Sequence, residues 1–370
     1  MRIALIHDWL NGMRGGEKVF EVLCELFPRA DVFTLFYEPL KVSPLIRSMK
    51  VRESPVARFV PGARRHYRWL LPFMPSMIEA IRLKDYDLAV STSHCVAKGI
   101  KPEPENTPHV CYCFTPMRYV WDKYHDYFGD MRRPSSWLMP LAREPLQKWD
   151  TETAADVTQF LTSSEYVRGR IREHLLRDAL VIPPPVDYAK FGETERSPGD
   201  FFLTVSALEP YKRVDVAIEA FRELGLPLKI AGSGTRMAQL RRAAPPNVEF
   251  LGWVSDEALA SLYSCARALI FPQDEDFGIV PLEAASSGCP VIAYGHGGAM
   301  ETIADGETGI FFCEQTPECL ADAVRAFRPA DFDSAKLRAH ARLFDRPVFK
   351  QRMADTLSCF IRPGAERPPA

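Results

Sequence analysis

The sequence contains no run of about 18 apolar residues, the length that a membrane-spanning helix requires. The apolar run near its start, at residues 3–6, is far too short for a signal peptide. The nine cysteines are odd in number and scattered, and no two are spaced as CxxC. These absences favour reduced thiols over a disulfide framework or a zinc site. They predict a cytoplasmic protein that reaches a membrane only from outside the bilayer.

A strong excess of either charge is also missing. The 370 residues carry a formal net charge of −2, which argues against a nucleic-acid-binding surface over the whole protein. Apolar residues make up 46% of the chain and charged residues 25%, as in ordinary globular proteins. Disorder over the whole chain is therefore excluded. At this length one hydrophobic core usually stops growing, so two domains are expected.

Short β-branched segments alternate with longer helical patterns, which predicts parallel α/β units. In the first half, strands are expected at residues 2–9, 30–36, 86–93, 109–115 and 157–164, with a helix at 17–27. In the second half, strands are expected at 201–207, 228–234, 248–253, 267–272 and 290–294, with helices at 213–224, 235–243, 256–264, 281–288 and 333–358.

The segment IPPPVDYAKFGETERSPGD divides the two halves, because three consecutive prolines continue neither a helix nor a central strand. The resulting interpretation is a Rossmann-like domain over 1–185, a linker over 186–199, a second Rossmann-like domain over 200–358 and a flexible tail over 359–370. The helical stretch at the end of the second domain is expected to pack against either domain. Doubly wound domains bind ligands at the carboxyl ends of their strands.

The stretch QDEDFGIVPLEAASSG joins three acids to an apolar helix that starts near Pro281 and ends at Gly288. Backbone amides at the start of this helix are free to bind an anion such as a diphosphate, and they belong to Phe277, Gly278, Ile279 and Val280. Glu275 and Glu283 would border the same ligand, where carboxylates suit sugar and ribose hydroxyls. Spacing alone leaves three interpretations of the acids open: a metal cradle, a solvated turn, and the edge of a ligand site.

A wider resemblance narrows these alternatives. The strings EDFGIVPLE, ASSGCPVIA and GGAMETI closely resemble the Glu-x7-Glu signature of retaining glycosyltransferases of family 4, which have the GT-B fold. The similarity extends, in the family's order, to HDWLNGMRGGEKV, SALEPYKRVD, IAGSG and NVEFLGWVSD. The section from VSTSHCVAKGI to HVCYCFTPMRYVWDKYHDYF is similar to bacterial enzymes that build O-antigen and exopolysaccharide, many of them mannosyltransferases. The resemblance implies GT-B architecture, in which two Rossmann-like doubly wound domains face each other across a cleft, the first binding the acceptor and the second the nucleotide-sugar.

The resemblance also implies roles for individual residues. Glu275 would contact the donor sugar, Glu283 the ribose, and Lys212 the diphosphate leaving group, whose developing charge must be stabilised. Further contacts to the nucleotide-sugar would come from Gly15, Gly16, Arg213, Gly232, Val254 and the four residues at 277–280. Because Lys212 and helix amides supply positive charge, no metal and no other cofactor is expected. The acids at 274–276 are then the edge of a ligand site.

Two positions depart from the family pattern. Ala207 stands where an arginine often accompanies the lysine, and Arg213 is one candidate to compensate for it. Phe114 replaces the histidine of the family's HTP segment, which leaves His94 as a candidate catalytic histidine. A purely structural role for this lone histidine stays open. On the acceptor side, the candidates are Asp8 and Arg118.

Residues 46–75 combine seven basic residues with interleaved aromatic and aliphatic side chains and a single acid, Glu53. The basic residues are Arg47, Lys50, Arg52, Arg58, Arg64, Arg65 and Arg68. Such a face suits anionic headgroups, and it predicts contact with the inner face of the cell membrane. The alternatives are a solvated insertion and a nucleic-acid patch, and no nucleic-acid partner is expected.

The function expected from the sequence is metal-independent, retaining sugar transfer to a lipid-linked or oligosaccharide acceptor in the biosynthesis of a cell-surface polysaccharide such as lipopolysaccharide. The first candidate donor is GDP-mannose. Two rival interpretations stay open. One is a GT-B sugar-nucleotide epimerase, and the other is a non-catalytic nucleotide-sugar-binding partner, which Ala207 and Phe114 suggest.

Overall fold

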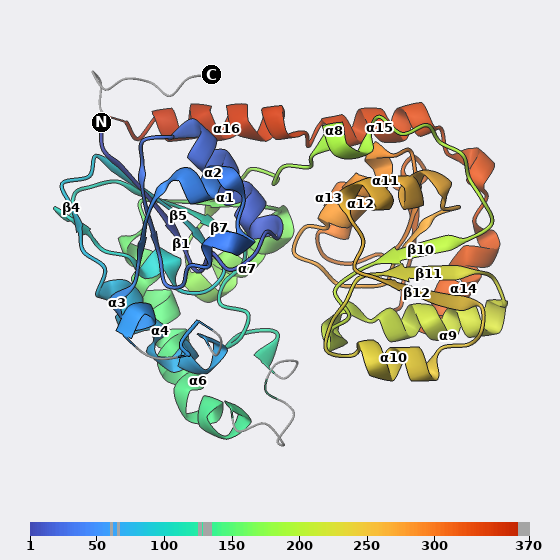
Figure 1. Ribbon diagram of the computed structural model, residues 1–370, viewed down its shortest axis with the longest axis horizontal. Coiled ribbons are helices and arrows are strands. Elements are labelled where there is room, and N and C mark those ends of the chain that lie inside the picture. Colours follow the sequence, from blue (N-terminus) through green and yellow to red (C-terminus); the bar gives the residue numbers. More distant parts are fainter. Residues whose placement is uncertain (60–61, 65–66, 125–127, 129–134, 362–370) are drawn as a thin grey trace. The chain divides into compact units, whose positions relative to one another are not determined.

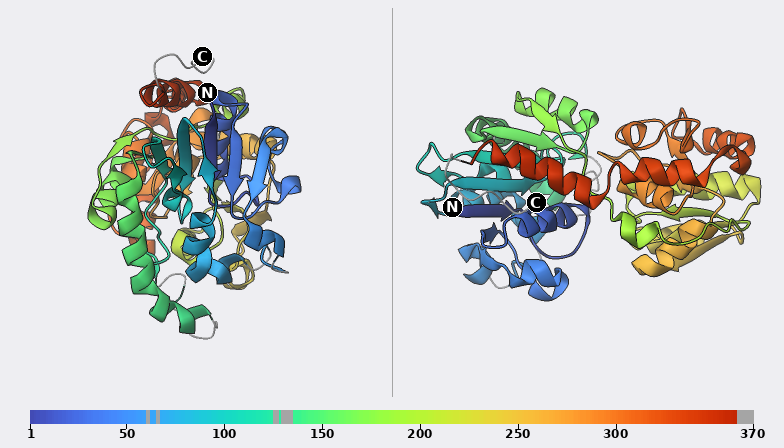
Figure 2. Two further views of the ribbon diagram at one scale, coloured as in Figure 1. Left: turned by 90° about the vertical axis from the view of Figure 1, so that its left-hand side faces the viewer. Right: turned by 90° about the horizontal axis from the view of Figure 1, so that it is seen from above.

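The computed structural model describes residues 1–59, 62–64, 67–124, 128 and 135–361. The chain forms two compact units. Unit 1 comprises Met1–Pro185 together with Phe349–Ala370, and unit 2 comprises Val186–Val348. Each unit is built around a parallel β-sheet with helices on both faces, as the alternating pattern of the sequence predicts (Figures 1 and 2).

The described strands of unit 1 form a parallel sheet in the order β3-β2-β1-β5-β7-β8-β9. These strands are β1 (Ile3–His7), β2 (Asp31–Thr34), β3 (Lys50–Glu53), β5 (Leu88–Ser93), β7 (His109–Cys113), β8 (Gln159–Thr162) and β9 (Ala179–Val181). A separate parallel pair joins β4 (Leu83–Lys84) to β6 (Pro102–Glu103). The central strands β1, β5 and β7 are buried along their whole length, which is typical of a sheet covered on both faces.

The helices of unit 1 divide between the two faces of its sheet (Figure 1). One face is covered by α1 (Gly15–Leu26), α2 (Pro44–Ser48) and the part of α16 (Arg346–Ser358) that begins at Phe349. The other face is covered by α3 (Pro55–Phe59), α4 (Met74–Glu79), α6 (Ser135–Glu152) and α7 (Glu165–Leu175). Short 3-10 helices connect these elements: η1 (Pro39–Lys41), η2 (Tyr67–Phe73), η3 (Ala97–Gly99) and η4 (Thr153–Asp156).

The described strands of unit 2 form a parallel sheet in the order β12-β11-β10-β13-β14-β15. They are β10 (Phe202–Val205), β11 (Leu228–Ala231), β12 (Val248–Gly252), β13 (Leu269–Phe271), β14 (Val291–Tyr294) and β15 (Gly309–Phe312). The strand order reverses between β10 and β13, the place where open α/β sheets usually bind their ligands. The loops that follow these two strands are therefore the first place to look for a site.

Helices again cover both faces of the sheet in unit 2. One face packs against α9 (Val214–Leu224), α10 (Met237–Ala243) and α14 (Pro317–Ala326). The other packs against α8 (Tyr188–Phe191), α11 (Asp256–Cys265), α12 (Ile279–Ser286) and α13 (Ala299–Thr302), with α15 (Ser334–Arg342) lying on α12. Two 3-10 helices complete the unit, η5 (Pro210–Lys212) and η6 (Pro329–Asp331).

Besides the edge strands β9 and β15, which the sequence analysis does not expect, three features differ from the expectation. The segment 186–199, expected to be a linker, belongs to unit 2, where Val186 pairs with Asp345 and α8 packs into the core. The helix expected over 333–358 is two helices, because the chain breaks before Pro347, which cannot continue α15. The basic stretch begins in α2 and continues through β3, an edge strand, so this part of it belongs to the sheet rather than to an insertion.

Within the described ranges, no helix is both long enough and apolar enough to cross a lipid bilayer.

Candidate active site

The loops that follow β10 and β13 lie side by side, because these strands are parallel neighbours in unit 2. The first loop passes through η5 to Lys212, and the second carries the acids at 274–276. The hydroxyl of Ser206 in the first loop donates a hydrogen bond to the side-chain oxygen of Gln273 in the second, at 2.8 Å. Side chains that are 67 positions apart in the sequence therefore meet at one edge of the sheet.

Lys212 and Glu275 form an ion pair between the ammonium Nζ and the carboxylate Oε1. Their side chains are mostly buried, with 14% and 19% of the surface exposed. The Nζ of Lys212 also lies 5.2 Å from the centre of the Tyr211 ring. Removing one partner of such a pair leaves the other charge poorly solvated. The residues to which the resemblance assigns the diphosphate and the sugar thus contact each other in this structure.

The acidic loop enters α12 through Gly278, which is the N-cap and has a φ of +93°. This backbone conformation strains any residue with a Cβ, so glycine is needed here. The neighbouring amides of Phe277, Ile279 and Val280 lie at the helix start, where N–H groups lack intrahelical acceptors. The side chain of Phe277 is only 6% exposed and packs in an apolar cluster, so it offers a ligand its backbone alone.

Glu283, on α12, is a nearly buried carboxylate with 8% of its surface exposed. Its Oε2 accepts a hydrogen bond from the hydroxyl of Tyr263 on α11, at 3.3 Å. Tyr263 is fully buried, and burial raises the pKa of its phenol well above the usual value, so the hydroxyl stays protonated and donates. One oxygen of Glu283 is therefore oriented from inside the unit.

The loop after β14 packs on the acidic stretch. The Nδ1 of His296 lies 3.0 Å from a carboxylate oxygen of Asp274. The amide of Gly298 donates to the carbonyl of Glu275 at 2.8 Å, and a Cβ at this glycine would stand 2.3 Å from the Cα of Phe277. Only a residue without a side chain allows this approach. Asp274 and Glu275 thus contact different side chains, an imidazole and an ammonium.

In the ranges that the structure describes, no three His, Cys, Asp or Glu side chains are grouped so that they could hold a metal ion. The nearest positive charge to Glu275 is instead supplied by the chain itself, through Lys212. The site therefore combines an ammonium, two carboxylates and a helix N-terminus, which together suit a ligand with both a diphosphate and hydroxyl groups.

Residues 187–342, nearly all of unit 2, match the protein-family model described as "Glycosyl transferases group 1". Unit 2 is therefore similar to the glycosyl transferases group 1 over nearly its whole length.

Curated relatives are similar over part of their length. The D-rhamnosyltransferase WbpZ of Pseudomonas aeruginosa is 30% identical over 197 residues, which cover 50% of this chain and 52% of that protein. The alpha-1,3/1,6-mannosyltransferase ALG2 of Dictyostelium discoideum is 24% identical over 280 residues, covering 62% and 66%. A GDP-mannose-dependent phosphatidylinositol monomannoside mannosyltransferase of Mycobacterium tuberculosis is 28% identical over 218 residues, covering 50% and 56%. The chain thus spans about half to two thirds of the length of these relatives.

Solved structures of similar fold cover almost the whole chain. The UDP complex of Anabaena HepE matches with a TM-score of 0.70 at 16% identity, covering 97% of this chain and all of that one. The lipopolysaccharide glycosyltransferase WaaG matches with a TM-score of 0.65 at 17% identity, covering 98% and 100%. At such identities the likeness concerns the fold alone. It confirms the predicted fold, two α/β domains with parallel sheets, as in the GT-B glycosyltransferases.

Three further residues of unit 2 that the sequence analysis singled out have structural partners. The guanidinium of Arg213 donates to Gln315 at 2.8 Å and lies 3.6 Å from Asp215, so it would have to leave both to replace the family's arginine. A Cβ at Gly232 would stand 1.9 Å from a backbone oxygen of the neighbouring loop, which explains this glycine without a ligand. Val254 is partly buried and packs against the core.

The candidate acceptor residues lie at the carboxyl edge of the sheet in unit 1. Asp8 is fully buried, and its carboxylate accepts four backbone hydrogen bonds from residues 94–97 at 2.7 to 3.0 Å. It therefore anchors the loop after β5 and has no exposed surface with which to contact an acceptor, which corrects the expectation for this residue.

His94 lies on the loop that Asp8 anchors. Its Nδ1 is 3.1 Å from the Asp8 carboxylate, and its side chain is 23% exposed. Burial, with the nearby charges of Arg118 and Arg14, lowers the pKa of His94 to about 3. The ring is thus neutral near pH 7, and the contact with Asp8 assigns the ring proton to Nδ1. Its Nε2 is then a hydrogen-bond acceptor, which can orient a hydroxyl donor.

The first βα loop reaches the same edge of unit 1. Gly15 begins α1, and a Cβ at Gly16 would stand 3.4 Å from the Phe114 ring and 3.7 Å from His7. The ring centre of Phe114 lies 6.3 Å from that of His94. Among the residues that the structure describes, none forms a hydrogen bond to the buried Nε2 of His7. The start of α1, Phe114 and His94 therefore lie close together.

Several charges in the basic stretch are paired with acids. Lys50 and Arg52 lie 3.0 and 3.5 Å from the carboxylate of Asp31, and Arg64 forms an ion pair with Glu53. These contacts leave less net charge for anionic headgroups than the composition predicts. Arg65 lies outside the described residues.

Aromatic side chains are the more prominent feature of the same stretch. On η2, the side chains of Trp69 and Phe73 are 59% and 64% exposed. Large aromatic groups in water cost free energy that a lipid interface or a partner protein would recover.

Sequence reasoning missed Tyr263, His296 and Gly298 as residues of the site. The glycines of GHGG after β14 were a usable signal, because a glycine pair after a strand often marks close backbone approach. Tyr263 carried no such signal, since its helix reads as an ordinary apolar face and only the fold brings it to Glu283.

Proposed function

We propose that this protein is a retaining, metal-independent glycosyltransferase that moves a sugar from a nucleotide-sugar to a hydroxyl of a lipid-linked or oligosaccharide acceptor. The observation that carries the proposal is the Lys212–Glu275 ion pair at the start of α12, in a unit that is similar to the glycosyl transferases group 1. An ammonium beside a helix N-terminus suits a diphosphate, and carboxylates on either side suit the hydroxyls of sugar and ribose.

In this proposal the anomeric C–O bond to the diphosphate breaks while the acceptor oxygen bonds to the same carbon from the same face. Lys212 and the amides at 277–280 stabilise the charge that grows on the departing diphosphate. The proton of the acceptor hydroxyl passes to an oxygen of the departing diphosphate, so no carboxylate base is required. Glu275 holds the sugar, and Glu283 holds the ribose with its orientation fixed by Tyr263.

The donor proposed first is GDP-mannose, since two relatives bear mannosyltransferase names and one of these is called GDP-mannose-dependent. The HepE structure was solved with UDP, so UDP-sugars are the direct competitors. A thermal-shift panel of GDP, UDP, ADP and their sugars separates them. A nucleotide at about 100 times its dissociation constant should add roughly 2.7 kcal/mol to stability.

The same panel separates the rival functions once consumption of the donor is followed. A transferase releases nucleoside diphosphate faster when an acceptor is present, whereas an epimerase converts the donor with no acceptor. A non-catalytic binding partner leaves the donor intact over days. We expect the protein to stay active in excess EDTA. If EDTA abolishes activity and manganese or magnesium restores it, the acids at 274–276 are better interpreted as a metal site.

We further propose that the protein works at an anionic membrane surface, where a lipid-linked acceptor would reside. The support is the exposure of Trp69 and Phe73 within the basic stretch 46–75. Changing both to serine should abolish co-sedimentation with phosphatidylglycerol vesicles while nucleotide binding persists. A matched control is the change of Leu40, 89% exposed on η1, to serine. Wild-type protein that ignores such vesicles would refute this part of the proposal.

A further inference from the structure

Two loops of unit 1 carry the candidate acceptor residues, and a buried network joins them. One loop, residues 94–99, follows β5 and carries His94. The other, residues 114–124, follows β7 and carries Arg118. Since Ser93 lies opposite Cys113 at the ends of these paired strands, both loops leave the sheet at the same edge. Such loops are normally the least constrained parts of a domain.

The first loop carries an almost completely buried lysine, Lys98, one residue before its end. The Nζ of Lys98 donates to the carbonyl of Asp150 at 2.5 Å and to the hydroxyl of Thr153 at 2.8 Å, and it lies 3.1 Å from the Asp150 carboxylate. The side chains of Lys98 and Asp150 are 2% and 0% exposed. A buried ion pair is a poor source of stability, because desolvation offsets most of its attraction. The Lys98–Asp150 pair is therefore better explained by the loops that it connects than by a gain in stability.

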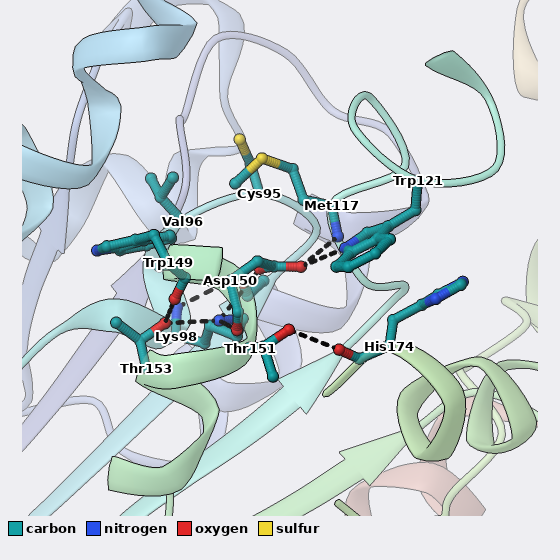
Figure 3. Close-up of polar contacts among 12 residues, drawn as sticks. Cys95, Val96, Lys98, Met117, Trp121, Trp149, Asp150, Thr151, Thr153 and His174 are labelled. Carbon is teal, nitrogen blue, oxygen red and sulfur yellow. Dashed lines mark hydrogen bonds and ion pairs between the residues drawn. The ribbon is translucent and has the colours of Figure 1, made fainter. Parts of the chain in front are cut away.

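The other carboxylate oxygen of Asp150 reaches the second loop. It accepts hydrogen bonds from the amide of Met117 at 3.3 Å and from the indole N–H of Trp121 at 2.8 Å. Figure 3 shows this carboxylate between Lys98 and the Trp121 ring, with both sets of contacts drawn. One side chain of α6 thus binds both loops at once.

The same helix holds the second loop at another point. Arg143 and Gln147 on α6 both donate to the carbonyl of Val120, at 3.0 and 2.9 Å. Beyond it, the ring of Trp121 stacks on His174 of α7 with the ring centres 4.5 Å apart. Arg118 therefore sits on a turn whose two ends are fixed to α6, one by an amide and one by a carbonyl.

We propose that Lys98 and Asp150 are positioning residues, which lock the loops at 94–99 and 114–124 together so that His94 and Arg118 face one acceptor. Neither residue touches the acceptor in this arrangement. The identity of the ligand rests on the proposed function, whereas the locking of the loops does not. Burial chiefly lowers the pKa of His94, and the charge of Arg118 lowers it further.

The test compares two substitutions that each remove one hydrogen bond from an aromatic side chain to a carboxylate. Trp121→Phe removes the bond to Asp150. The control, Tyr86→Phe, removes the bond to Asp31, at 2.5 Å, at the other edge of the sheet. Hydrogen–deuterium exchange of the full chain is followed by mass spectrometry. Trp121→Phe should speed exchange at 114–124 and 94–99 by about tenfold, the factor that loss of one ordinary hydrogen bond implies. The control should leave both segments unchanged.

A second readout needs no ligand and reports the position of Arg118. In the Trp121→Phe protein, the His94 ring should begin to take up a proton at a higher pH than in wild type, because the guanidinium has moved away. Nuclear magnetic resonance follows this, with the signal assigned from a His94→Gln protein. Exchange that is no faster than in the control overturns the locking of the loops. Faster exchange with an unchanged His94 titration shows that the network is merely structural, which also overturns the proposal.

Donor chemistry keeps this test separate from the proposed function. In Trp121→Phe, nucleoside diphosphate affinity should match wild type, while transfer to methyl α-mannoside as a soluble acceptor should fall with a raised KM for that acceptor. If wild-type protein binds no nucleotide-sugar, the proposed function is refuted. The hydrogen–deuterium exchange and the His94 titration would still test whether the two loops are locked together. Asp150→Asn is the second variant. Because Lys98 loses its countercharge in this variant, exchange at both loops and the KM for the acceptor should rise more than in Trp121→Phe.

Discussion

Replacing Glu275 by glutamine should make the protein bind nucleoside diphosphates more tightly while it loses turnover. The carboxylate of Glu275 forms an ion pair with the ammonium of Lys212, the group that we propose for the diphosphate. A diphosphate that binds Lys212 would therefore compete with this carboxylate. The neutral amide keeps the size of the side chain but competes far less for Lys212, so binding should become easier.

The size of the effect follows from the environment of the pair. With 14% and 19% exposure, the two side chains lie between a surface pair and a fully buried one. Measured couplings of exposed pairs reach about 1 kcal/mol, which corresponds to an affinity gain of about fivefold. Partial burial makes this a lower bound. Turnover should fall by a larger factor in the opposite direction, because the contact with the sugar at its reacting end is lost.

The assay is isothermal titration of GDP and UDP against wild type and Glu275→Gln, with turnover of the bound donor measured on the same preparations. Asp274→Asn serves as the control. It also removes one negative charge, at the position next to Glu275, but the carboxylate of Asp274 contacts His296. An equal gain in both variants would mean that the effect is general electrostatics. Weaker binding in Glu275→Gln would refute the competition for Lys212 altogether.

Three more outcomes follow from the structure. Lys212→Ala should weaken nucleoside diphosphate binding and turnover more than Arg213→Ala, since Arg213 is held by other partners, and equal losses in titration and kinetics would contradict this. Tyr263→Phe should reduce the preference for GDP over 2′-deoxy-GDP, because the ribose carboxylate loses its orienting hydrogen bond; an unchanged ratio of affinities speaks against that role. Burial lowers the pKa of His7 and of His109 to about 3, so the unfolded chain takes up protons below about pH 6.5 that the native state refuses. Stability should therefore fall by up to about 1.4 kcal/mol per pH unit for each histidine as pH drops toward 3, and urea unfolding at pH 7, 6 and 5 that shows no decline would exclude this.

The sequence was sufficient to predict most strands of both sheets, because their residues are apolar on both faces and stand out from their surroundings. The edge strand β3 was missed for the opposite reason. Its residues alternate between exposed and half-buried and include Lys50 and Arg52, so its composition is that of a surface loop. Only pairing with β2 gives it strand structure, and pairing is a property of the fold.

The candidate site divides in the same way. Glu275, Glu283 and Lys212 could be named from local strings, because each belongs to a short motif at a strand end. The residues that orient a functional side chain or its loop could not be named in this way. Tyr263 lies 20 positions from Glu283, and Asp150 lies 52 positions from Lys98, within helices whose patterns are explained by ordinary packing. Asp8 shows the converse error, since its place after the first strand suited a ligand contact but its carboxylate is fully used by backbone amides.

The return of the chain to unit 1 at Phe349 has a consequence for its synthesis on the ribosome. Phe349, Met353 and Leu357 of α16 complete the apolar core that α1 and the central strands begin. All of residues 186–348 are translated between these two contributions. At common elongation rates this takes on the order of 10 s, during which the face of the first sheet that carries α1 and α2 lacks its last helix. Unit 2, a continuous segment, can fold in that interval. We therefore expect the nascent chain to be most prone to aggregation, and most dependent on chaperones, just before α16 leaves the ribosome.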